Sequence, residues 1–295
     1  MLYGAIEAGG TKMICGIGDK DGNIIEKVSI PTKTPEITMP EIVKFLKKYD
    51  IKAIGIACFG PIDLDRNSKT YGYITSTPKV AWQNFDFVGY LSKEFGIPIG
   101  FDTDVNGSLL GELTYGDIKG INDAVYITIG TGIGAGIMSN GKLVHGMLHP
   151  EAGHIILPIR EDDNYEGRCP FHKNCFEGLA SGPAVEERWN ESGKNLSDRK
   201  EVWDLEAHYI AMALMNYILI MSPRKIILGG GIMNQQQLFP LVREKVVSLL
   251  NGYIKSKEIE NIETYIVPAS LNGDQGLLGA LKLGIDEYVN FMNNK

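Results

Sequence analysis

The chain has 295 residues, 44% of them hydrophobic, and its 36 Asp and Glu outnumber its 29 Lys and Arg to give a net charge of −7. This balance is typical of a soluble globular protein of about two domains, and the acidic surplus argues against binding to nucleic acid or to an anionic membrane. No run of about 18 apolar residues is present and the first residues lack the basic region of a signal peptide, so we expect a cytoplasmic protein with no membrane partner.

Turn-forming residues divide the first part of the chain into short apolar segments. Asp21-Gly22-Asn23 predicts a hairpin turn, and the apolar run at 53–57 predicts a buried strand. The expected elements are strands at 2–8, 12–18 and 24–30, a helix at 41–49, a strand at 53–57, a surface loop at 60–84, a helix at 85–95, a strand at 97–101 and a helix at 105–115.

The second part of the chain begins the same order again. Asn140-Gly141 is the strongest hairpin pattern in the sequence. The expected elements are strands at 123–129, 133–139 and 142–144, a helix at 201–221, a strand at 225–228, a helix at 238–250, a strand at 264–267 and a helix at 275–283. The repetition predicts two related α/β domains with mixed sheets and a cleft between them, with a boundary near 115–122.

Three glycine-rich turns follow predicted strands. Gly9-Gly10-Thr11-Lys12 and Gly130-Thr131-Gly132 offer backbone N–H groups, hydroxyls and a lysine to a phosphate, and Gly229-Gly230-Gly231 would let a flat nucleoside lie against the backbone. Each turn alone is also compatible with an ordinary hairpin or helix start, and none matches a Walker A or dinucleotide-binding pattern. Together they favour a nucleoside triphosphate.

Asp104 lies where the strand predicted at 97–101 leads into the helix predicted at 105–115. An aspartate in this place often caps the helix. The alternative is a general base that takes a proton from an attacking hydroxyl, which is the one carboxylate that phosphoryl transfer needs.

Four metal-ligand side chains occur between residues 154 and 175. His154, Cys169, His172 and Cys175 form one of the standard tetrahedral zinc sets, and with four protein ligands the site is expected to be structural. A Cys169–Cys175 disulfide is the alternative, which a reducing cytoplasm disfavours, and thiol redox chemistry is weaker still because no C-x-x-C is present. Glu151 and Glu177 flank this loop and suit hydrogen bonding to a polyol, although either could be a solvated surface acid.

These motifs together resemble the ROK family of sugar kinases and repressors, within the actin-like ATPase superfamily, over essentially the whole chain. The matching segments are Glu7-Ala8-Gly9-Gly10-Thr11-Lys12, Asp104-Val105-Asn106-Gly107, Gly130-Thr131-Gly132-Ile133-Gly134 and Glu151-Ala152-Gly153-His154. The loop from Cys169 to Glu177 and the following Gly178-Leu179-Ala180-Ser181-Gly182-Pro183-Ala184 are similar to the bacterial fructokinase branch.

The resemblance implies a two-lobed actin-like ATPase (ribonuclease H-like) fold with a cleft between lobes. The first lobe would span 1–115, joined by a C-terminal helix at 281–295, and the second 116–280. It also implies a homodimer that uses ATP and Mg²⁺ to phosphorylate D-fructose at its 6-hydroxyl, with Asp104 as general base. Glu7 stands where the superfamily usually has an aspartate that helps to hold Mg²⁺.

The resemblance further implies roles for single residues. Thr103 stands where many glucose-specific members have Asn, which puts glucose in doubt and favours fructose. Glu151, His154 and Glu177 would orient the sugar, with His154 also bound to zinc, and Pro183 would face the nucleoside. The alternatives are a kinase for mannose, glucose or an N-acetylated hexose, and a sugar-responsive regulator. A repressor is disfavoured because the first motif begins at Glu7 and leaves no room for a winged helix ahead of it.

Overall fold

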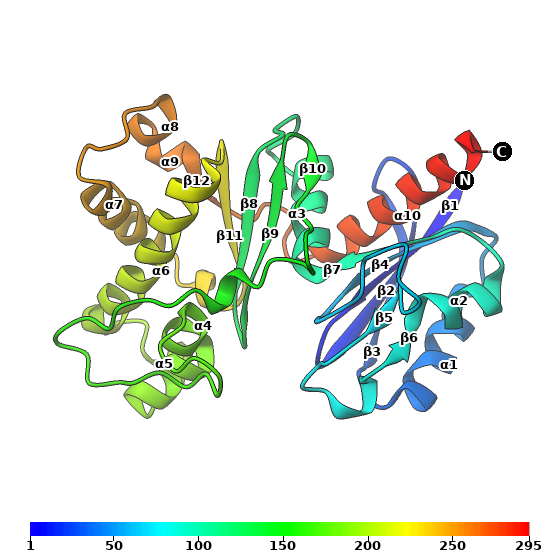
Figure 1. Cartoon of the computed structure of the whole chain (residues 1–295), viewed down its shortest axis with the longest axis horizontal. Helices are drawn as coiled ribbons and strands as arrows, with labels where there is room; N and C mark the ends of the chain where they lie inside the picture. The colour runs from blue at the N-terminus through cyan, green and yellow to red at the C-terminus, as the bar shows by residue number, and fades with distance from the viewer. Residues whose placement is uncertain (295) are drawn as a thin grey trace. The chain divides into compact units, whose positions relative to one another are not determined.

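The computed structural model describes residues 1–294, and it consists of two compact α/β units (Figure 1). Unit 1 contains Met1–Gly120, Leu143–Pro150 and the segment that begins at Ser270, whereas unit 2 contains Ile121–Lys142 and Glu151–Ala269. Each unit is built on one five-stranded sheet. The α/β class and the mixed sheets predicted from the sequence are confirmed.

The sheet of unit 1 combines an antiparallel and a parallel half. β1 pairs antiparallel with β2 and parallel with β4, and β4 pairs parallel with β7. The β1–β2 turn and the carboxyl ends of β4 and β7 therefore lie at the same edge of the sheet. The spatial order is β3 (Ile24–Pro31), β2 (Lys12–Gly18), β1 (Leu2–Ala8), β4 (Ile51–Cys58) and β7 (Ile99–Thr103).

Helices cover both faces of this sheet. Alternation along β1 sends Ile6 and Ala8 toward one apolar core, whereas Tyr3 and Ala5 pack with Leu277 in another. Helices α1 and α2 line the first core, and α10 lies over the second with α3 beside it. Their bounds are α1 (Pro35–Leu46), α2 (Phe87–Phe95), α3 (Asp104–Tyr115) and α10 (Gln275–Asn293).

Glycines allow α10 to lie directly on the sheet and on α3. A Cβ built at Gly279 would lie 1.7 Å from the backbone oxygen of Gly107 in α3, and one built at Gly55 in β4 would lie 1.7 Å from the oxygen of Ala280. These are backbone contacts that no side-chain rotation can relieve. The two helices expected at 275–283 and 281–295 are one continuous helix, because Gly279 and Gly284 serve close packing and do not break it.

We expect Gly279→Ala to lower the free energy of unfolding by about 3 kcal/mol or more, because its methyl group must push α10 away from α3. Urea unfolding followed by circular dichroism would measure the change. Gly146→Ala is the matched control, since a Cβ at Gly146 meets nothing within 4 Å. Equal stability of the two variants would show that the close approach of α10 does not depend on glycine.

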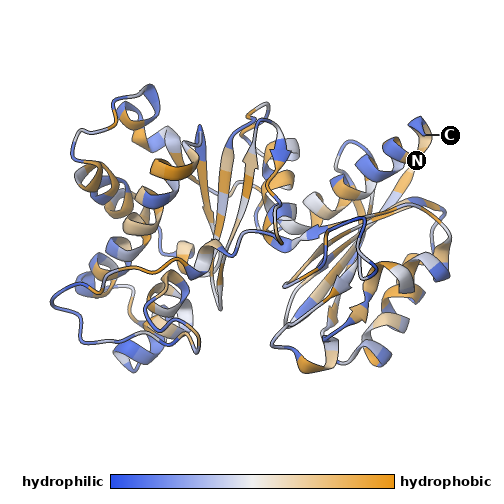
Figure 2. Cartoon of the chain, viewed as in Figure 1, coloured by the Kyte–Doolittle hydropathy of each residue, from blue (hydrophilic) through white to orange (hydrophobic). Residues whose placement is uncertain are grey.

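The sheet of unit 2 repeats the strand arrangement of unit 1. β8 pairs antiparallel with β9 and parallel with β11, which pairs parallel with β12. The spatial order is β10 (Lys142–Leu143), β9 (Ile133–Ser139), β8 (Ala124–Ile129), β11 (Lys225–Gly229) and β12 (Ile266–Pro268). The helices of the unit are α4 (Phe176–Ala180), α5 (Gly182–Trp189), α6 (Lys200–Met221), α7 (Leu238–Leu250), α8 (Lys257–Glu260) and α9 (Ile262–Tyr265), with single 3₁₀ turns at η2 (Ala152–His154), η3 (Gly193–Asn195) and η4 (Ile232–Asn234). Figure 2 shows hydrophobic residues on the strands of both sheets and on the helices that cover them.

The segment 60–84 is not the surface loop expected from the sequence. Ile62, Ile74 and Trp82 are each at most 1% exposed, and the Trp82 indole N–H donates to the Lys33 carbonyl at 2.6 Å. The segment folds over the first core through β5 (Tyr73–Ile74), which pairs with β6 (Phe85–Asp86), and a single turn η1 (Val80–Trp82). Its three core side chains are separated by many turn residues, so they form no periodic pattern from which a buried segment could be predicted.

Helix α1 begins six residues earlier than the expected start at Glu41, because Pro35 occupies its first turn and Pro40 is accommodated inside it. Among residues 1–294, no helix combines the length and apolarity needed to cross a membrane.

Candidate active site

The β1–β2 turn of unit 1 carries the first set of predicted phosphate-binding residues, Gly9, Gly10, Thr11 and Lys12. The Gly9 N–H donates to the Lys12 carbonyl at 3.1 Å, and the Thr32 hydroxyl donates to the Gly9 carbonyl at 2.7 Å. A Cβ at Gly9 would lie 2.7 Å from the Lys12 oxygen, so the closed turn requires glycine there. Thr11 and Lys12 are exposed, which leaves a hydroxyl and an ammonium group accessible to a ligand.

A second lysine, Lys79, lies against the same turn. A Cβ built at Gly10 would come within 2.6 Å of the Lys79 Cε. The backbone N–H of Lys79 donates to the Thr77 hydroxyl at 3.3 Å, and its carbonyl accepts from the Trp82 N–H at 2.8 Å. No sequence motif marks Lys79, which lies in the segment 60–84 expected to be a surface loop.

The junction between β7 and α3 places Asp104 at the same sheet edge as this turn. The helix cap is Thr103, not Asp104: the Thr103 hydroxyl accepts from the Asn106 N–H at 3.1 Å, and Asp104 is the first helical residue. The Asp104 carboxylate accepts from the Val105 N–H at 2.9 Å and is half-buried. The capping alternative for Asp104 is therefore wrong, because the preceding residue already performs that role.

Glu7, on the α10 face of β1, lies close to Asp104. Burial, together with the negative charges of Asp104 and Asp274, raises the pKa of Glu7 to about 7. Its carboxylate packs so closely on α10 that a Cβ at Gly276 would lie 2.5 Å from the Glu7 Cδ. Neighbouring carboxylates in a partly buried place fit the oxygen-rich surroundings that Mg²⁺ prefers.

The β8–β9 turn of unit 2 carries the second set of predicted phosphate-binding residues, Gly130, Thr131 and Gly132. The Gly130 N–H donates to the Gly132 carbonyl at 2.9 Å, and Thr131 is exposed. Glu177 reaches this turn from α4: its Oε2 accepts from the Ile133 N–H at 2.9 Å, and a Cβ at Gly132 would lie 2.8 Å from the same oxygen. The structure thus connects Glu177, at the end of the segment Cys169–Glu177 (the metal loop), to the second turn.

The third glycine group, Gly229-Gly230-Gly231, is constrained mainly from within the unit. A Cβ at Gly229 would lie 2.4 Å from the Tyr126 hydroxyl, and Gly230 has a φ of +88° with its Cβ position 2.4 Å from the Ile129 oxygen. Only at Gly231 would a Cβ meet no atom within 4 Å. A nucleoside could therefore approach this backbone at Gly231, whereas the other two glycines are explained by packing.

Pro183 stands at the start of α5, next to Gly182, whose N–H donates to the Gly130 carbonyl at 2.7 Å. It lines a hollow of about 520 Å³ together with Arg168, Glu186, Glu187, Asn190, Glu191, Ser192 and Asn195. The glutamates favour a neutral group over phosphate in this hollow.

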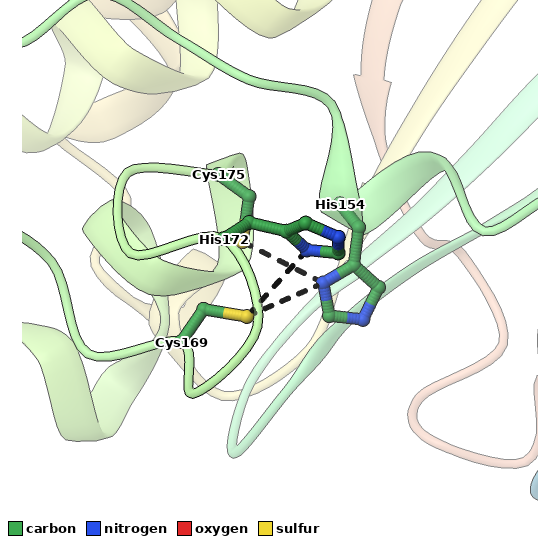
Figure 3. A group of neighbouring side chains, drawn as sticks. All are labelled: His154, Cys169, His172 and Cys175. Atoms are coloured by element: carbon green, nitrogen blue, oxygen red, sulfur yellow. Dashed lines mark hydrogen bonds between the residues drawn. The ribbon is translucent and has the colours of Figure 1, made fainter.

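The four predicted metal ligands converge in unit 2. Their ligand atoms all lie within 4.8 Å of one another, and both cysteines are unbridged. The Cys169 Sγ lies 3.8 Å from the His154 Nδ1 and 3.7 Å from the His172 Nδ1, and the Cys175 Sγ lies 3.5 Å from the His154 Nδ1 (Figure 3). A tetrahedral Zn²⁺ with bonds of about 2.0–2.3 Å separates neighbouring S and N ligands by about 3.6 Å, so the residues fit the ion.

Local structure forms this cluster from two segments. His154 is the last residue of the single turn η2, and its backbone N–H donates to the Glu151 carbonyl at 2.9 Å. Cys175 caps α4, where its sulfur accepts from the Gly178 N–H at 3.3 Å. Glu151 and Glu177 therefore belong to the two different segments that form the ligand cluster.

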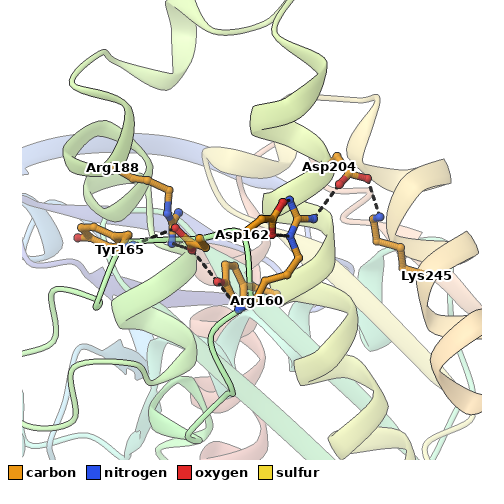
Figure 4. A network of polar contacts seen from close by, with 8 residues as sticks. Arg160, Asp162, Tyr165, Arg188, Asp204 and Lys245 are labelled. Carbon is orange, nitrogen blue, oxygen red and sulfur yellow. Dashed lines mark hydrogen bonds and ion pairs between the residues drawn. The ribbon is translucent and has the colours of Figure 1, made fainter.

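Ion pairs fix the segment that leads into the metal loop (Figure 4). Arg160 bonds to Asp204 in α6 at 2.8 Å, and Asp204 also accepts from Lys245 at 2.6 Å. Nearby, the buried Arg188 and Asp163 form an ion pair at 3.3 Å. These bonds connect the segment at 160–163 to α5 and α6, and through Asp204 to α7.

Glu206 in α6 is a buried acid that this network leaves unsatisfied. It is 1% exposed, and neither carboxyl oxygen has a hydrogen-bond partner in the described chain. Burial raises its pKa well above the usual range, with only a partial opposing effect from Arg188.

We expect Glu206→Gln to stabilise the protein increasingly as pH rises. Folded Glu206 keeps a proton that the unfolded chain releases above about pH 4.3, so the wild type loses stability with rising pH until its folded pKa is passed. Thermal unfolding at pH 4 and pH 8 should show near-equal stability at pH 4 and a gain for the variant at pH 8, which grows by about 1.4 kcal/mol for each pH unit between the unfolded and folded pKa values. Glu201→Gln, an exposed acid on the same helix, is the control; a pH-independent difference for Glu206→Gln would contradict the assignment.

The family model described as "ROK family" matches residues 3–287 of the chain. The chain belongs to the ROK family. Curated relatives of this ROK protein include fructokinases from Streptococcus mutans, 47% identical over 96% of this chain and 97% of the relative, and from Pediococcus pentosaceus, 44% identical over 96% and 97%. A Zymomonas mobilis fructokinase is 39% identical over 96% of each chain.

Solved structures of ROK proteins share the fold. A ROK hexokinase from Thermus thermophilus aligns with a TM-score of 0.78 at 24% identity, covering 98% of this chain and 100% of that one. A ROK family glucokinase from Streptomyces griseus, solved with glucose and AMPPNP, aligns with a TM-score of 0.73 at 23% identity, covering 97% and 100%. The actin-like fold predicted for this ROK protein is confirmed.

The predicted site residues of this ROK protein form two groups. Unit 1 holds one group at a single sheet edge: Gly9, Gly10, Thr11, Lys12, Thr103 and Asp104. Unit 2 holds the other: Gly130, Thr131, Gly132, Glu151, His154, Cys169, His172, Cys175, Glu177, Pro183 and Gly229–Gly231.

Proposed function

We propose that this ROK protein transfers the γ-phosphoryl group of ATP to the 6-hydroxyl of D-fructose. The observation that carries the proposal is the full-length match to fructokinases at 39 to 47% identity. The kinase class is consistent with two glycine turns whose exposed threonines and N–H groups can bind phosphates, and with one carboxylate at a strand end.

In the proposed mechanism, Asp104 accepts the proton of the attacking hydroxyl. The carboxylate is attached to the first turn of α3, which Thr103 caps, so its position relative to the turn at Gly9–Lys12 is fixed within one unit. Lys12 and Thr11 bind phosphate oxygens, and the Gly130–Gly132 turn binds others through its N–H groups. Glu7 would help to hold Mg²⁺, which would supply positive charge that neutralises the phosphates.

The sugar-binding residues in this proposal come from the metal loop of unit 2. Glu151 and Glu177 accept hydrogen bonds from sugar hydroxyls. The His154 Nδ1 faces both cysteine sulfurs, so its ring directs Nε2 away from the cluster, toward a second hydroxyl. Pro183 and Gly231 face the nucleoside.

We also propose that the four-ligand cluster binds one Zn²⁺. Two thiolates and two imidazoles at mutual distances below 4.8 Å match a closed tetrahedral site, which has no open position for water activation. The ion would act by holding η2 and the start of α4 together.

The experiment that tests the function is a coupled ADP-release assay with fructose, mannose, glucose and N-acetylglucosamine. Fructose should have the highest kcat/KM, with mannose second. A kcat/KM for glucose or N-acetylglucosamine more than tenfold above that of fructose would move the chain to another specificity. No sugar-dependent ADP release at all would leave the regulator alternative.

A further inference from the structure

His145 contacts the strand that leads to Asp104. Its Nε2 lies 2.8 Å from Oδ2 of Asp102, the penultimate residue of the strand before Thr103. The Asp102 side chain is 5% exposed and that of His145 39%. Because a carboxylate only accepts, Nε2 carries the proton of this bond, and the same bond raises the pKa of His145.

Asp102 also accepts hydrogen bonds from both sides of the β7–α3 junction. Its Oδ1 accepts from the side-chain amide of Asn106 at 2.8 Å and from the Thr103 N–H at 2.7 Å. The Asn106 Nδ2 lies 3.5 Å from the His145 Nε2, so two donors converge on one carboxylate. Asp102 thereby connects the last residue of β7 to the second residue after Asp104, and Asp104 lies inside the bridged turn.

The negative charge of Asp102 also affects the pKa of Tyr71, which lies on the loop between β4 and β5. Burial is the main cause of the raised pKa of Tyr71, to which Asp102 contributes, whereas Arg66 opposes it. His145, when protonated, is the ion-pair partner of Asp102.

His145 belongs to a segment, Leu143–Pro150, that packs within unit 1 although Lys142 before it and Glu151 after it belong to unit 2. A second histidine of the segment, His149, accepts from the Ile62 N–H at 3.2 Å. The two histidines therefore hold the segment on unit 1, His145 at the end of β7 and His149 at the loop that follows β4.

We infer that His145 is a positioning residue for Asp104: its bond to Asp102 fixes the turn from Thr103 to Asn106 and so sets the direction of the catalytic carboxylate. The inference rests on the proposed kinase function. No sequence pattern indicated it, because His145 and Asp102 are distant in the chain and neither lies in a predicted motif.

Loss of His145 should affect the chemical step more than binding. A displacement of a catalytic group by about 1 Å can cost on the order of 10²-fold in rate. We expect His145→Ala to lower kcat by roughly 10- to 100-fold, with the KM for ATP changed less than threefold. His145→Gln can still donate to Asp102 from its amide and should retain kcat within about threefold of wild type.

The test is a double-mutant cycle of His145→Ala and Asp102→Asn, measured as kcat with fructose and ATP. If the two residues act through one bond, His145→Ala in the Asp102→Asn background should cost less than about threefold further. Imidazole NMR of the full chain supplies a readout independent of turnover: the His145 pKa should fall in Asp102→Asn. His149→Ala is the comparison variant, because it loosens the same segment without touching Asp102.

Three results would overturn the inference: His145→Gln as impaired as His145→Ala, additive losses in the cycle, or His149→Ala as impaired as His145→Ala. The last would mean that only anchoring of the segment matters. Wild-type protein that phosphorylates no sugar would instead refute the proposed function, and the NMR measurement would still decide whether the His145–Asp102 bond exists.

Discussion

Asp104→Asn should lower kcat by roughly 10²–10⁴-fold while leaving the fold and the binding of both substrates intact. An amide cannot accept the hydroxyl proton, and a positioned general base is worth about that factor. The cap of α3 is unaffected, because Thr103 supplies it. Steady-state kinetics with fructose and ATP measure kcat, and thermal unfolding with and without ATP checks folding and binding.

The matched control for this variant is Glu36→Gln. Glu36 is also an acid in the first turn of a helix, on α1, and it is exposed. Both substitutions remove a negative charge near a helix N-terminus, where the stability effect is typically 0.3–1 kcal/mol. A kcat of Asp104→Asn within threefold of wild type would falsify the assignment of Asp104 as the base.

The strands and glycine turns of this ROK protein were predictable because they depend on local chemistry. Asp21-Gly22-Asn23 and Asn140-Gly141 mark real hairpins, and the segments beside them form β2, β3, β9 and β10. The repeated order of these segments was enough to predict two α/β units with mixed sheets.

Features that depend on tertiary packing were not predictable in the same way. Gly279 and Gly284 resemble helix breakers in a linear sequence, but they are the positions at which α10 touches α3 and β4. Trp82 lies among turn residues, yet its ring is fully buried. A local pattern cannot show what a distant segment will press against.

The candidate site divides along the same line. The four metal ligands could be found because three lie within seven residues and their chemistry is distinctive. Lys79 and His145 could not be found, because each reaches the site from a loop whose sequence carries no motif. The unexpected bond from Ile133 to Glu177 likewise joins two motifs that the sequence presents as separate.

The proposed zinc should be needed for sugar binding although it touches no reacting atom. We predict one tightly bound zinc per chain, and we expect Cys175→Ser to lose it and to reduce kcat/KM for fructose on the order of 10²-fold, chiefly through KM. The physical reason is that Glu177 lies two residues beyond Cys175 in α4, and His154, with Glu151 before it, is bound to the same ion in the proposal.

Serine is the informative substitution at this position. Cys175 caps α4 through the bond from the Gly178 N–H, and a serine hydroxyl can accept the same bond. Cys175→Ser therefore removes the metal-binding thiolate while keeping the helix start. Cys15→Ala, at a buried cysteine in β2, is the control that should retain the zinc.

Elemental analysis of protein purified without added metal gives the zinc content, and titrations with fructose and with ATP separate the two substrates. The KM for ATP should change far less than the KM for fructose, because the Gly130–Gly132 turn keeps its own bond and the bond from Gly182. Glu177 contributes only one of the contacts of that turn, at Ile133. The opposite result would be wild-type protein that contains no zinc and carries a Cys169–Cys175 disulfide, found by mass spectrometry under reducing conditions. It would show that a disulfide, and not a metal ion, holds the loop, and that the positions of Glu151 and Glu177 do not depend on zinc.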